Sequence, residues 1–231
     1  MESDGISARL EQVRERIERA RARAGRGGAV TLVAVTKTHP PETVQAAIRA
    51  GVTDVGENRV QELEGKVAAV GRDAVRWHLI GHLQRNKVRQ ALPLFDLIHS
   101  LDSERLAQAL SAEAVKMGVT VRALVEINSV GEESKSGFAA DEAVDAVGRI
   151  ATLPGLELVG MMTMAPFTDD ESIIRRAFAN TRRAAEEAER QVPGFRAAHL
   201  SMGMSNDFEI AVEEGATLVR VGSSIFGERG A

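Results

Sequence analysis

The sequence predicts an α/β fold in which an extra N-terminal helix precedes a single (β/α)₈ TIM barrel. Three observations support this prediction: eight short apolar runs, helical patterns between them, and a length of 231 residues. Alternation of strands and helices with short connections favours a parallel sheet, and eight repeats in about 200 residues favour a closed barrel. Barrels of about 200–250 residues commonly form one domain. We therefore expect residues 1–231 to form one domain.

The first segment predicts a helix that ends near Gly25, because its apolar residues recur at helical spacing. These residues are Ile6, Leu10, Val13 and Ile17. Helical patterns such as PETVQAAIRA and SERLAQALSAEAVKMG separate the strands that follow. The predicted strands are TLVAVTK (31–37), TDVGEN (53–58), RWHLIG (76–81), DLIHSLD (96–102), VRALVEIN (121–128), LELVGMMTM (156–164), AHLSMGMS (198–205) and TLVRVG (217–222).

An open, doubly wound sheet is the alternative fold. Such a sheet usually carries a G-x-G-x-x-G turn after its first strand, whereas this chain has KTHPPE there. The barrel is therefore the better prediction.

The composition excludes several classes of protein. Acidic residues number 33 and basic residues 29, so the net charge of −4 predicts no binding to nucleic acid. The chain has no cysteine, which excludes disulfides, thiolate metal sites and a cysteine nucleophile. The start, MESDGISARLEQ, is charged, and no run reaches the roughly 18 apolar residues of a membrane span. We expect a cytoplasmic protein that does not enter membranes.

The active site of a barrel lies where its strands end. Cationic and hydrogen-bonding residues follow several predicted strands, without a cluster of carboxylates. They are Lys37; Glu57, Asn58 and Arg59; His82, Gln84, Asn86 and Lys87; Asn128; Met162, Thr163 and Met164; residues 201–206; and Arg220, Gly222, Ser223 and Ser224.

The last two predicted strands end in loops of small residues, SMGMSND (201–207) and VGSSIFG (221–227). Small residues let backbone N–H groups approach a ligand, and barrels commonly hold phosphate at this position. The simpler interpretation is that Ser205 or Asn206 caps a helix and Gly222 fits a tight turn. Two such loops side by side favour a phosphate site.

Lys37 ends the first apolar strand and is expected to face these loops. It could contact phosphate as a point charge, or its amine could form a Schiff base. Partial burial at the end of an apolar strand lowers the pKa of a lysine and frees its lone pair, which favours the Schiff base. A phosphorylated aldehyde would then be the ligand, with pyridoxal 5′-phosphate as the first candidate.

Arg220 is expected on the same strand face as Gly222, where its guanidinium would donate to a pyridine nitrogen and keep it unprotonated. An ion pair across the barrel is the alternative. His78, His82 and His99 lack the spacing of metal ligands, so we expect hydrogen-bonded structural histidines and no metal site. Lys135, in the loop SKSGF, could reach a ligand or face water.

Motifs along nearly the whole chain, from about residue 8 to 229, resemble those of the pyridoxal phosphate homeostasis protein family. They are VAVTK, GENRVQE, WHLIGHLQRNK, SLD, KSGF, GMMTM and LSMGMSNDFEIAVEEGATLVRVGSSIFG. The resemblance implies a fold-type III barrel, like the N-terminal domain of alanine racemase, that binds pyridoxal 5′-phosphate. It further implies that Lys37 forms the Schiff base, Arg220 faces the pyridine nitrogen and Asn58 lies near the ring. The phosphate contacts it implies are Ser201, Gly222, Ser223 and Ser224.

The resemblance also predicts a function without catalysis: holding the cofactor and delivering it, as a monomer, to apo-enzymes that depend on it. An amino-acid racemase is the alternative. In alanine racemases the second acid/base is a tyrosine presented with the help of a second domain, and this chain has neither tyrosine nor cysteine. A histidine, aspartate or glutamate of the barrel would have to replace it. A class I aldolase is a third reading, but it would usually carry its lysine on a later strand.

Overall fold

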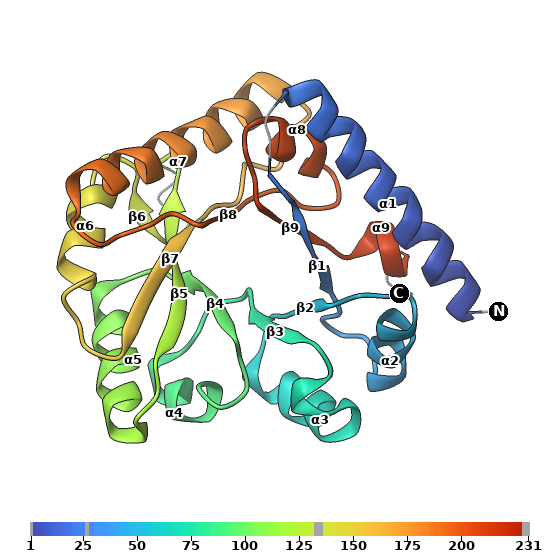
Figure 1. Cartoon of the computed structure of the whole chain (residues 1–231), viewed down its shortest axis with the longest axis horizontal. Coiled ribbons are helices and arrows are strands. Elements are labelled where there is room, and N and C mark those ends of the chain that lie inside the picture. Colours follow the sequence, from blue (N-terminus) through green and yellow to red (C-terminus); the bar gives the residue numbers. More distant parts are fainter. Residues whose placement is uncertain (1, 26–27, 132–135, 228–231) are drawn as a thin grey trace.

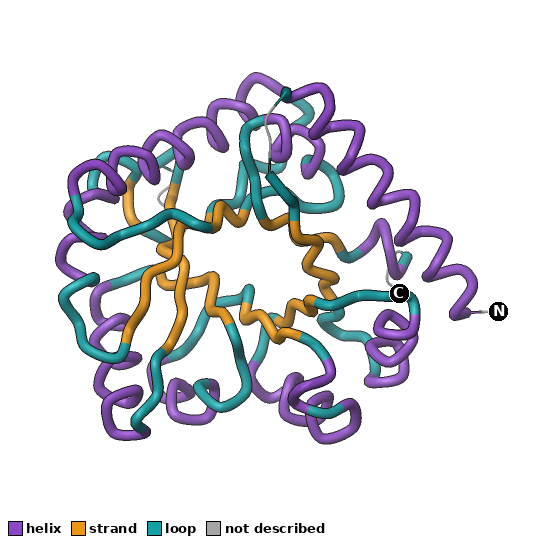
Figure 2. The backbone as a smooth tube through the Cα atoms, in the orientation of Figure 1, coloured by secondary structure: helices purple, strands orange, loops and turns teal. Residues whose placement is uncertain are grey.

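The predicted closed barrel is confirmed in a computed structural model that describes residues 2–25, 28–131 and 136–227. Eight parallel strands form a ring in the order β4-β3-β2-β1-β9-β8-β7-β5, and a β4–β5 pairing closes it. Figure 2 shows this ring with helices around its outside. The strands are β1 (Thr31–Val35), β2 (Asp54–Glu57), β3 (Arg76–Leu79), β4 (Leu97–Leu101), β5 (Val121–Asn128), β7 (Leu156–Met162), β8 (His199–Ser201) and β9 (Leu218–Val221).

One short strand lies outside the prediction. β6 (Phe138–Ala139) pairs in parallel with the end of β5, in the segment that the sequence predicted as a loop. Two residues are too few to produce a periodic apolar pattern. Lys135, which precedes this strand, lies outside the described residues.

The helices form the outer layer of the barrel, and α7 runs across the top of the view in Figure 1. They are α1 (Glu2–Ala24), α2 (Pro41–Arg49), α3 (Val60–Val70), α4 (Val88–Ala91), α5 (Glu104–Met117), α6 (Ala143–Ile150), α7 (Glu171–Gln191), α8 (Phe208–Glu213) and α9 (Ser223–Phe226). Two 3₁₀ turns, η1 (Arg72–Ala74) and η2 (Arg85–Lys87), complete the described elements.

Helix α1 buries the apolar face that its spacing predicted, with Ile6, Leu10, Val13 and Ile17 each at most 3% exposed. It packs beside α8 and α9 (Figure 1). Arg16 pairs with Glu209 at 2.8 Å and lies 4.5 Å over the ring of Phe208 in α8. Arg9 donates to the carbonyl of Ile225 in α9 at 2.5 Å. The extra helix therefore contacts α8, which follows the first small-residue loop, and α9, which lies within the second.

The barrel interior is apolar over most of its surface but contains several buried polar side chains from neighbouring strands. They are Asp54, His78, His99, Glu126, Ser201 and Arg220. Buried polar groups need partners, so the contacts of these residues define the inner layer of the site. Within the described ranges, no helix has the length and apolar character needed to span a bilayer.

Candidate functional site

A cavity of about 770 Å³ opens where the barrel strands end. Five of the seven residues predicted to bind the cofactor line it, namely Lys37, Asn58, Arg220, Gly222 and Ser223, whereas Ser201 and Ser224 do not. Apolar side chains such as Val35, Ile80 and Met164 complete parts of the wall. The structure thus brings an amine, a guanidinium and a small-residue loop together around one space.

Lys37 follows β1 by two residues and is half-buried. The chain turns sharply after it, because Thr38 has a φ of 67°, in the left-handed region that a threonine rarely adopts. The backbone on either side is held in place: Glu62 accepts from the N–H of Thr38 at 3.0 Å, and Lys66 donates to the carbonyl of Thr36 at 2.7 Å. These contacts fix the backbone from which the Lys37 side chain enters the cavity.

A buried ion pair lies behind Lys37. The Nζ of Lys66 is 2.6 Å from Oε1 of Glu57, and the two side chains are 5% and 0% exposed. Thr36 also donates its hydroxyl to Glu57. Burial raises the pKa of Glu57, although the hydrogen bonds from Lys66 and Thr36 oppose this shift. In the described part of the chain, Oε2 of Glu57 has no hydrogen-bond partner.

Asn58 follows Glu57 at the end of β2, and its backbone packs against Gly81, which follows β3 by two residues. A Cβ atom at Gly81 would lie 2.5 Å from the carbonyl oxygen of Asn58, so glycine is required there for the close approach. Both residues line the cavity. The side of the cavity next to Lys37 is therefore closed by two backbone segments in contact.

The two small-residue loops meet at Ser205, which also lines the cavity. Its hydroxyl accepts from the backbone N–H of Gly222 at 3.3 Å and from that of Ser224 at 3.5 Å. Asp207, rather than Ser205 or Asn206, occupies the N-cap position of α8. The simple helix-cap interpretation of this loop is therefore wrong, and Ser205 joins the loops.

Arg220, on β9, is 4% exposed and lines the cavity. Its Nη1 donates to the carbonyl and hydroxyl oxygens of Ser201 at 2.8 and 2.6 Å, and its Nη2 donates to the carbonyl of Thr163 at 3.0 Å. Burial lowers the pKa of Arg220 to about 10, while the charges of Asp207 and Glu126 oppose this shift. The guanidinium therefore stays protonated at neutral pH, and these hydrogen bonds go to neutral oxygens.

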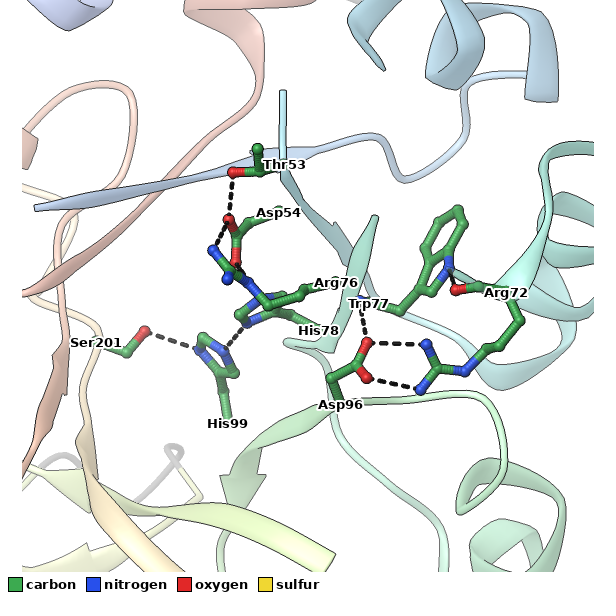
Figure 3. Close-up of polar contacts among 9 residues, drawn as sticks. All are labelled: Thr53, Asp54, Arg72, Arg76, Trp77, His78, Asp96, His99 and Ser201. Atoms are coloured by element: carbon green, nitrogen blue, oxygen red, sulfur yellow. Dashed lines mark hydrogen bonds and ion pairs between the residues drawn. The ribbon is translucent and has the colours of Figure 1, made fainter. Parts of the chain in front are cut away.

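Ser201, which was predicted as a phosphate contact, does not line the cavity. It ends β8, is 0% exposed, and holds its hydroxyl between Arg220 and His99, which lies 2.8 Å away. The hydroxyl belongs to the barrel interior because the strand continues to this residue and aims its side chain inward. The expectation of hydrogen-bonded histidines is confirmed for His78 and His99, whose rings are joined at 2.9 Å (Figure 3).

Glu126 is a titratable cavity residue that the sequence prediction missed. It is 6% exposed and lines the cavity, and burial, with the negative charge of Asp102, raises its pKa to about 7. Arg220 and His82 oppose this shift. A carboxyl that titrates near neutral pH can accept or donate a proton. Its sequence signal was a single acidic residue inside the apolar run VRALVEIN.

His82 also lines the cavity and is hydrogen-bonded through Nδ1 to Asp102 at 2.8 Å. Its side chain is 62% exposed, so it stands at the mouth rather than in the interior. Within the described ranges, no group of three or more histidine and acidic side chains is placed to hold a metal ion.

The groups around the cavity fit a phosphorylated aldehyde. Lys37 provides an amine, and Ser205, Gly222 and Ser223 line another side of the cavity, where the backbone N–H groups of Gly222 and Ser224 converge on the Ser205 hydroxyl. Gly203, which precedes Ser205, has a φ of 92°, and a Cβ there would lie 2.5 Å from the side chain of Ala211. The path of this loop therefore depends on a glycine.

A family model described as "Alanine racemase, N-terminal domain" matches residues 8–230. The fold and the cavity thus define the class of barrel found in that domain. An alanine racemase of Clostridium difficile shares this fold at a TM-score of 0.77 and 16% identity, with 99% of this chain and 57% of that chain covered.

Curated relatives are more similar. The "Pyridoxal phosphate homeostasis protein" of Aquifex aeolicus is 40% identical over 222 residues, covering 96% of this chain and 97% of the relative. The protein of the same name from Deinococcus radiodurans is 42% identical over 212 residues, covering 91% of this chain and 95% of the relative. PipY of Synechococcus elongatus, solved with PLP bound, has a TM-score of 0.84 and 35% identity, covering 96% of this chain and 100% of PipY. The chain belongs to the family of pyridoxal phosphate homeostasis proteins.

Proposed function

We propose that this chain binds pyridoxal 5′-phosphate in the cavity, holds it covalently through Lys37, and delivers it to apo-enzymes that require it. One observation carries the proposal: a single cavity is lined by Lys37, by Arg220 and by two loops of small residues that meet at Ser205. The names of the relatives and the PLP-bound structure of PipY support the same ligand. When bound, the cofactor supplies an electrophilic aldehyde carbon and an electron-withdrawing ring.

In this proposal, each residue has a separate task. Lys37 provides the amine that bonds to the aldehyde, Arg220 donates a hydrogen bond to the ring nitrogen, and Asn58 lies beside the ring. The phosphate is held by backbone and hydroxyl donors of Gly222, Ser223 and Ser224, and Ser205 replaces Ser201 in that group. Because Ser205 contacts both loops, its hydroxyl supports the site as well as the ligand.

The phosphate assignment is tested by Ser205→Ala and Ser223→Ala. A hydrogen bond to a charged group contributes roughly 1.5–3 kcal/mol, so each variant should bind the cofactor about tenfold more weakly or worse. Ser7→Ala, far along the chain in α1, is the control. Unchanged affinity in both loop variants would place the phosphate elsewhere.

We also infer that the protein, as a monomer, delivers the cofactor to apo-enzymes without itself catalysing a reaction of amino acids. Loaded protein is incubated with an apo-enzyme across a dialysis membrane and in direct mixture, and recovered activity of that enzyme is followed. Faster recovery in the mixture than across the membrane supports delivery by contact. Equal rates contradict it and leave simple release.

A racemase-like activity is the second candidate, and Glu126 favours it, since a cavity carboxyl with a pKa near 7 can exchange a proton. The test is incubation of loaded protein with L-amino acids in deuterated water. Exchange of the α-proton at about 1 s⁻¹ or faster, lost in Glu126→Gln, would establish an enzyme. Exchange far below that rate supports the carrier.

A further inference from the structure

A chain of buried hydrogen bonds crosses the barrel interior, and Figure 3 shows its members from Asp54 to Ser201. We call it the Asp54–Arg220 chain; its members are Asp54, His78, His99, Ser201 and Arg220, from strands β2, β3, β4, β8 and β9. Its links are Arg220 Nη1 to Ser201 Oγ at 2.6 Å, Ser201 Oγ to His99 Nδ1 at 2.8 Å, His99 Nε2 to His78 Nδ1 at 2.9 Å, and His78 Nε2 to Asp54 Oδ1 at 3.0 Å. Each member is at most 4% exposed.

The end of the chain away from the cavity is anchored by Asp54. Arg76 donates to both oxygens of Asp54 at 2.7 Å, and Thr53 donates its hydroxyl at 2.7 Å. Burial disfavours the carboxylate, but the hydrogen bonds from His78, Arg76 and Thr53 outweigh it and hold the pKa of Asp54 well below its usual range. The Arg76 side chain is 63% exposed, so the chain runs from solvent at the opposite end of the barrel to the cavity.

The chemistry of the two ends sets the direction of every hydrogen bond. A carboxylate can accept but cannot donate, and a guanidinium can donate but cannot accept. His78 must therefore carry its proton on Nε2 to meet Asp54, which leaves Nδ1 as an acceptor if the ring is neutral. His99 then donates from Nε2 and accepts at Nδ1.

The Ser201 hydroxyl completes this order. With His99 Nδ1 as an acceptor, the hydroxyl hydrogen of Ser201 points to His99, and its oxygen is left to accept from Arg220. The opposite arrangement would require protons on both ring nitrogens of His78, next to Asp54. The Ser201 oxygen would then have to accept from both His99 and Arg220. All the donors in the chain thus point from the cavity toward Asp54.

We propose that the Asp54–Arg220 chain positions the guanidinium of Arg220 for its ligand. Three hydrogen bonds, to Ser201 and to the carbonyl of Thr163, fix the plane of the guanidinium and leave further N–H donors for the cavity. The inference rests on the proposed function for the identity of the ligand, but the chain itself exists without a ligand. Asp54, His78, His99 and Ser201 are therefore positioning residues of the site, contributed by four strands.

The direction of the chain is tested in protein without cofactor. Nitrogen-15 NMR of the histidine rings, assigned with the variants His78→Gln and His99→Gln, reports which nitrogen carries the proton. We expect Nε2–H on both rings. A proton on Nδ1 of His99 would overturn the proposal, whatever the cofactor does.

The coupling to the cavity is tested with three variants at two histidines. His99→Leu removes both the donor and the acceptor, whereas His99→Gln can retain both. His199→Gln is the matched control, because His199 begins β8 and is half-buried but is not a member of the chain. Each variant is titrated with pyridoxal phosphate, and its visible absorption spectrum is recorded.

We expect His99→Leu to bind roughly three- to tenfold more weakly with a shifted visible band, since a typical hydrogen bond is lost. His99→Gln and His199→Gln should retain the parent band. Should His99→Leu fail to fold, Ser201→Ala takes its place with the same expectation. If the parent protein binds no cofactor, the proposed function is wrong, but the NMR result still tests the direction of the chain. If the parent binds the cofactor and His99→Leu or Ser201→Ala behaves like His199→Gln, the positioning role is wrong.

Discussion

Two buried polar layers support the cavity, one between β2 and α3 and one inside the barrel, and they differ in charge. Behind Lys37 lies a buried ion pair, Glu57 with Lys66, in which one carboxylate oxygen has no partner within the described ranges. Behind Arg220 lies the Asp54–Arg220 chain, whose two histidines are linked on both ring nitrogens. A buried charge pair is sensitive to the loss of either partner, whereas the uncharged links in the middle of the Asp54–Arg220 chain mainly set orientation. Substitutions in the ion pair should therefore lower the stability of the fold, whereas substitutions in the Asp54–Arg220 chain should mainly change the orientation of Arg220.

The largest expected effect comes from breaking the ion pair. Lys66→Met leaves Glu57 buried without its cation, which should lower the free energy of unfolding by about 3–5 kcal/mol. The measurement is denaturant unfolding followed by circular dichroism. Lys116→Met is the control, because its ion pair with Glu113 is exposed, and such pairs contribute about 0–1 kcal/mol.

A double variant sharpens that test. Glu57→Gln combined with Lys66→Met removes both charges, and most of the lost free energy of unfolding should return. If the double variant is as unstable as Lys66→Met alone, the destabilisation comes from lost packing and the assignment to buried charge is wrong.

The next effect concerns pH and the cavity carboxyl Glu126. Burial raises its pKa from 4.5 to about 7, so the folded protein holds a proton that the unfolded chain releases between these values. The contribution of protonated Glu126 to the stability of the folded state is therefore fully present below about pH 4.5, and it is lost as the pH rises through 7. Glu126→Gln should remove this loss and raise stability at pH 8 by about 3 kcal/mol relative to the parent.

Unfolding free energies at pH 4.5, 6 and 8 provide the measurement for Glu126. Glu157→Gln is the control, since Glu157 is exposed and its change should leave the pH profile of the parent in place. A profile for Glu126→Gln that falls as steeply as that of the parent would show that another group titrates in this range.

The smallest expected effect on stability comes from a substitution next to the ion pair behind Lys37. Thr36→Val removes one hydroxyl donor from Glu57, and the loss of one hydrogen bond to a charged group should cost about 1.5–3 kcal/mol of unfolding free energy. Thr181→Val is the control, because that buried hydroxyl donates to a carbonyl of its own helix, at Ala177. Equal stabilities of the two variants would mean that Glu57 does not depend on Thr36.

The sequence was sufficient for the barrel because eight apolar runs and intervening helices repeat regularly, and each predicted run contains an observed strand. It was also sufficient to bring Lys37, Arg220 and Gly222 to one cavity, since strands of a parallel barrel end at the same face. These inferences use order along the chain and strand direction, which are local properties.

The inner layers could not be predicted in the same way. Ser201 was expected at the phosphate, but its partner His99 lies 102 positions away, and strand register decides that they meet inside the barrel. The role of Ser205 depends on two loops meeting in space. Lys66 lies in a helix pattern where a lysine is normally exposed, and its burial against Glu57 follows from tertiary packing.

Reduction of the cofactor-loaded protein with borohydride, followed by peptide mass mapping, tests the central claim most directly. We expect a pyridoxyl adduct on Lys37, and we expect Lys37→Ala to yield none after the same treatment. An adduct on Lys87 or Lys135 instead, in a Lys37→Ala protein that still takes up the cofactor and keeps the yellow colour of the loaded parent, would contradict the assignment of the site.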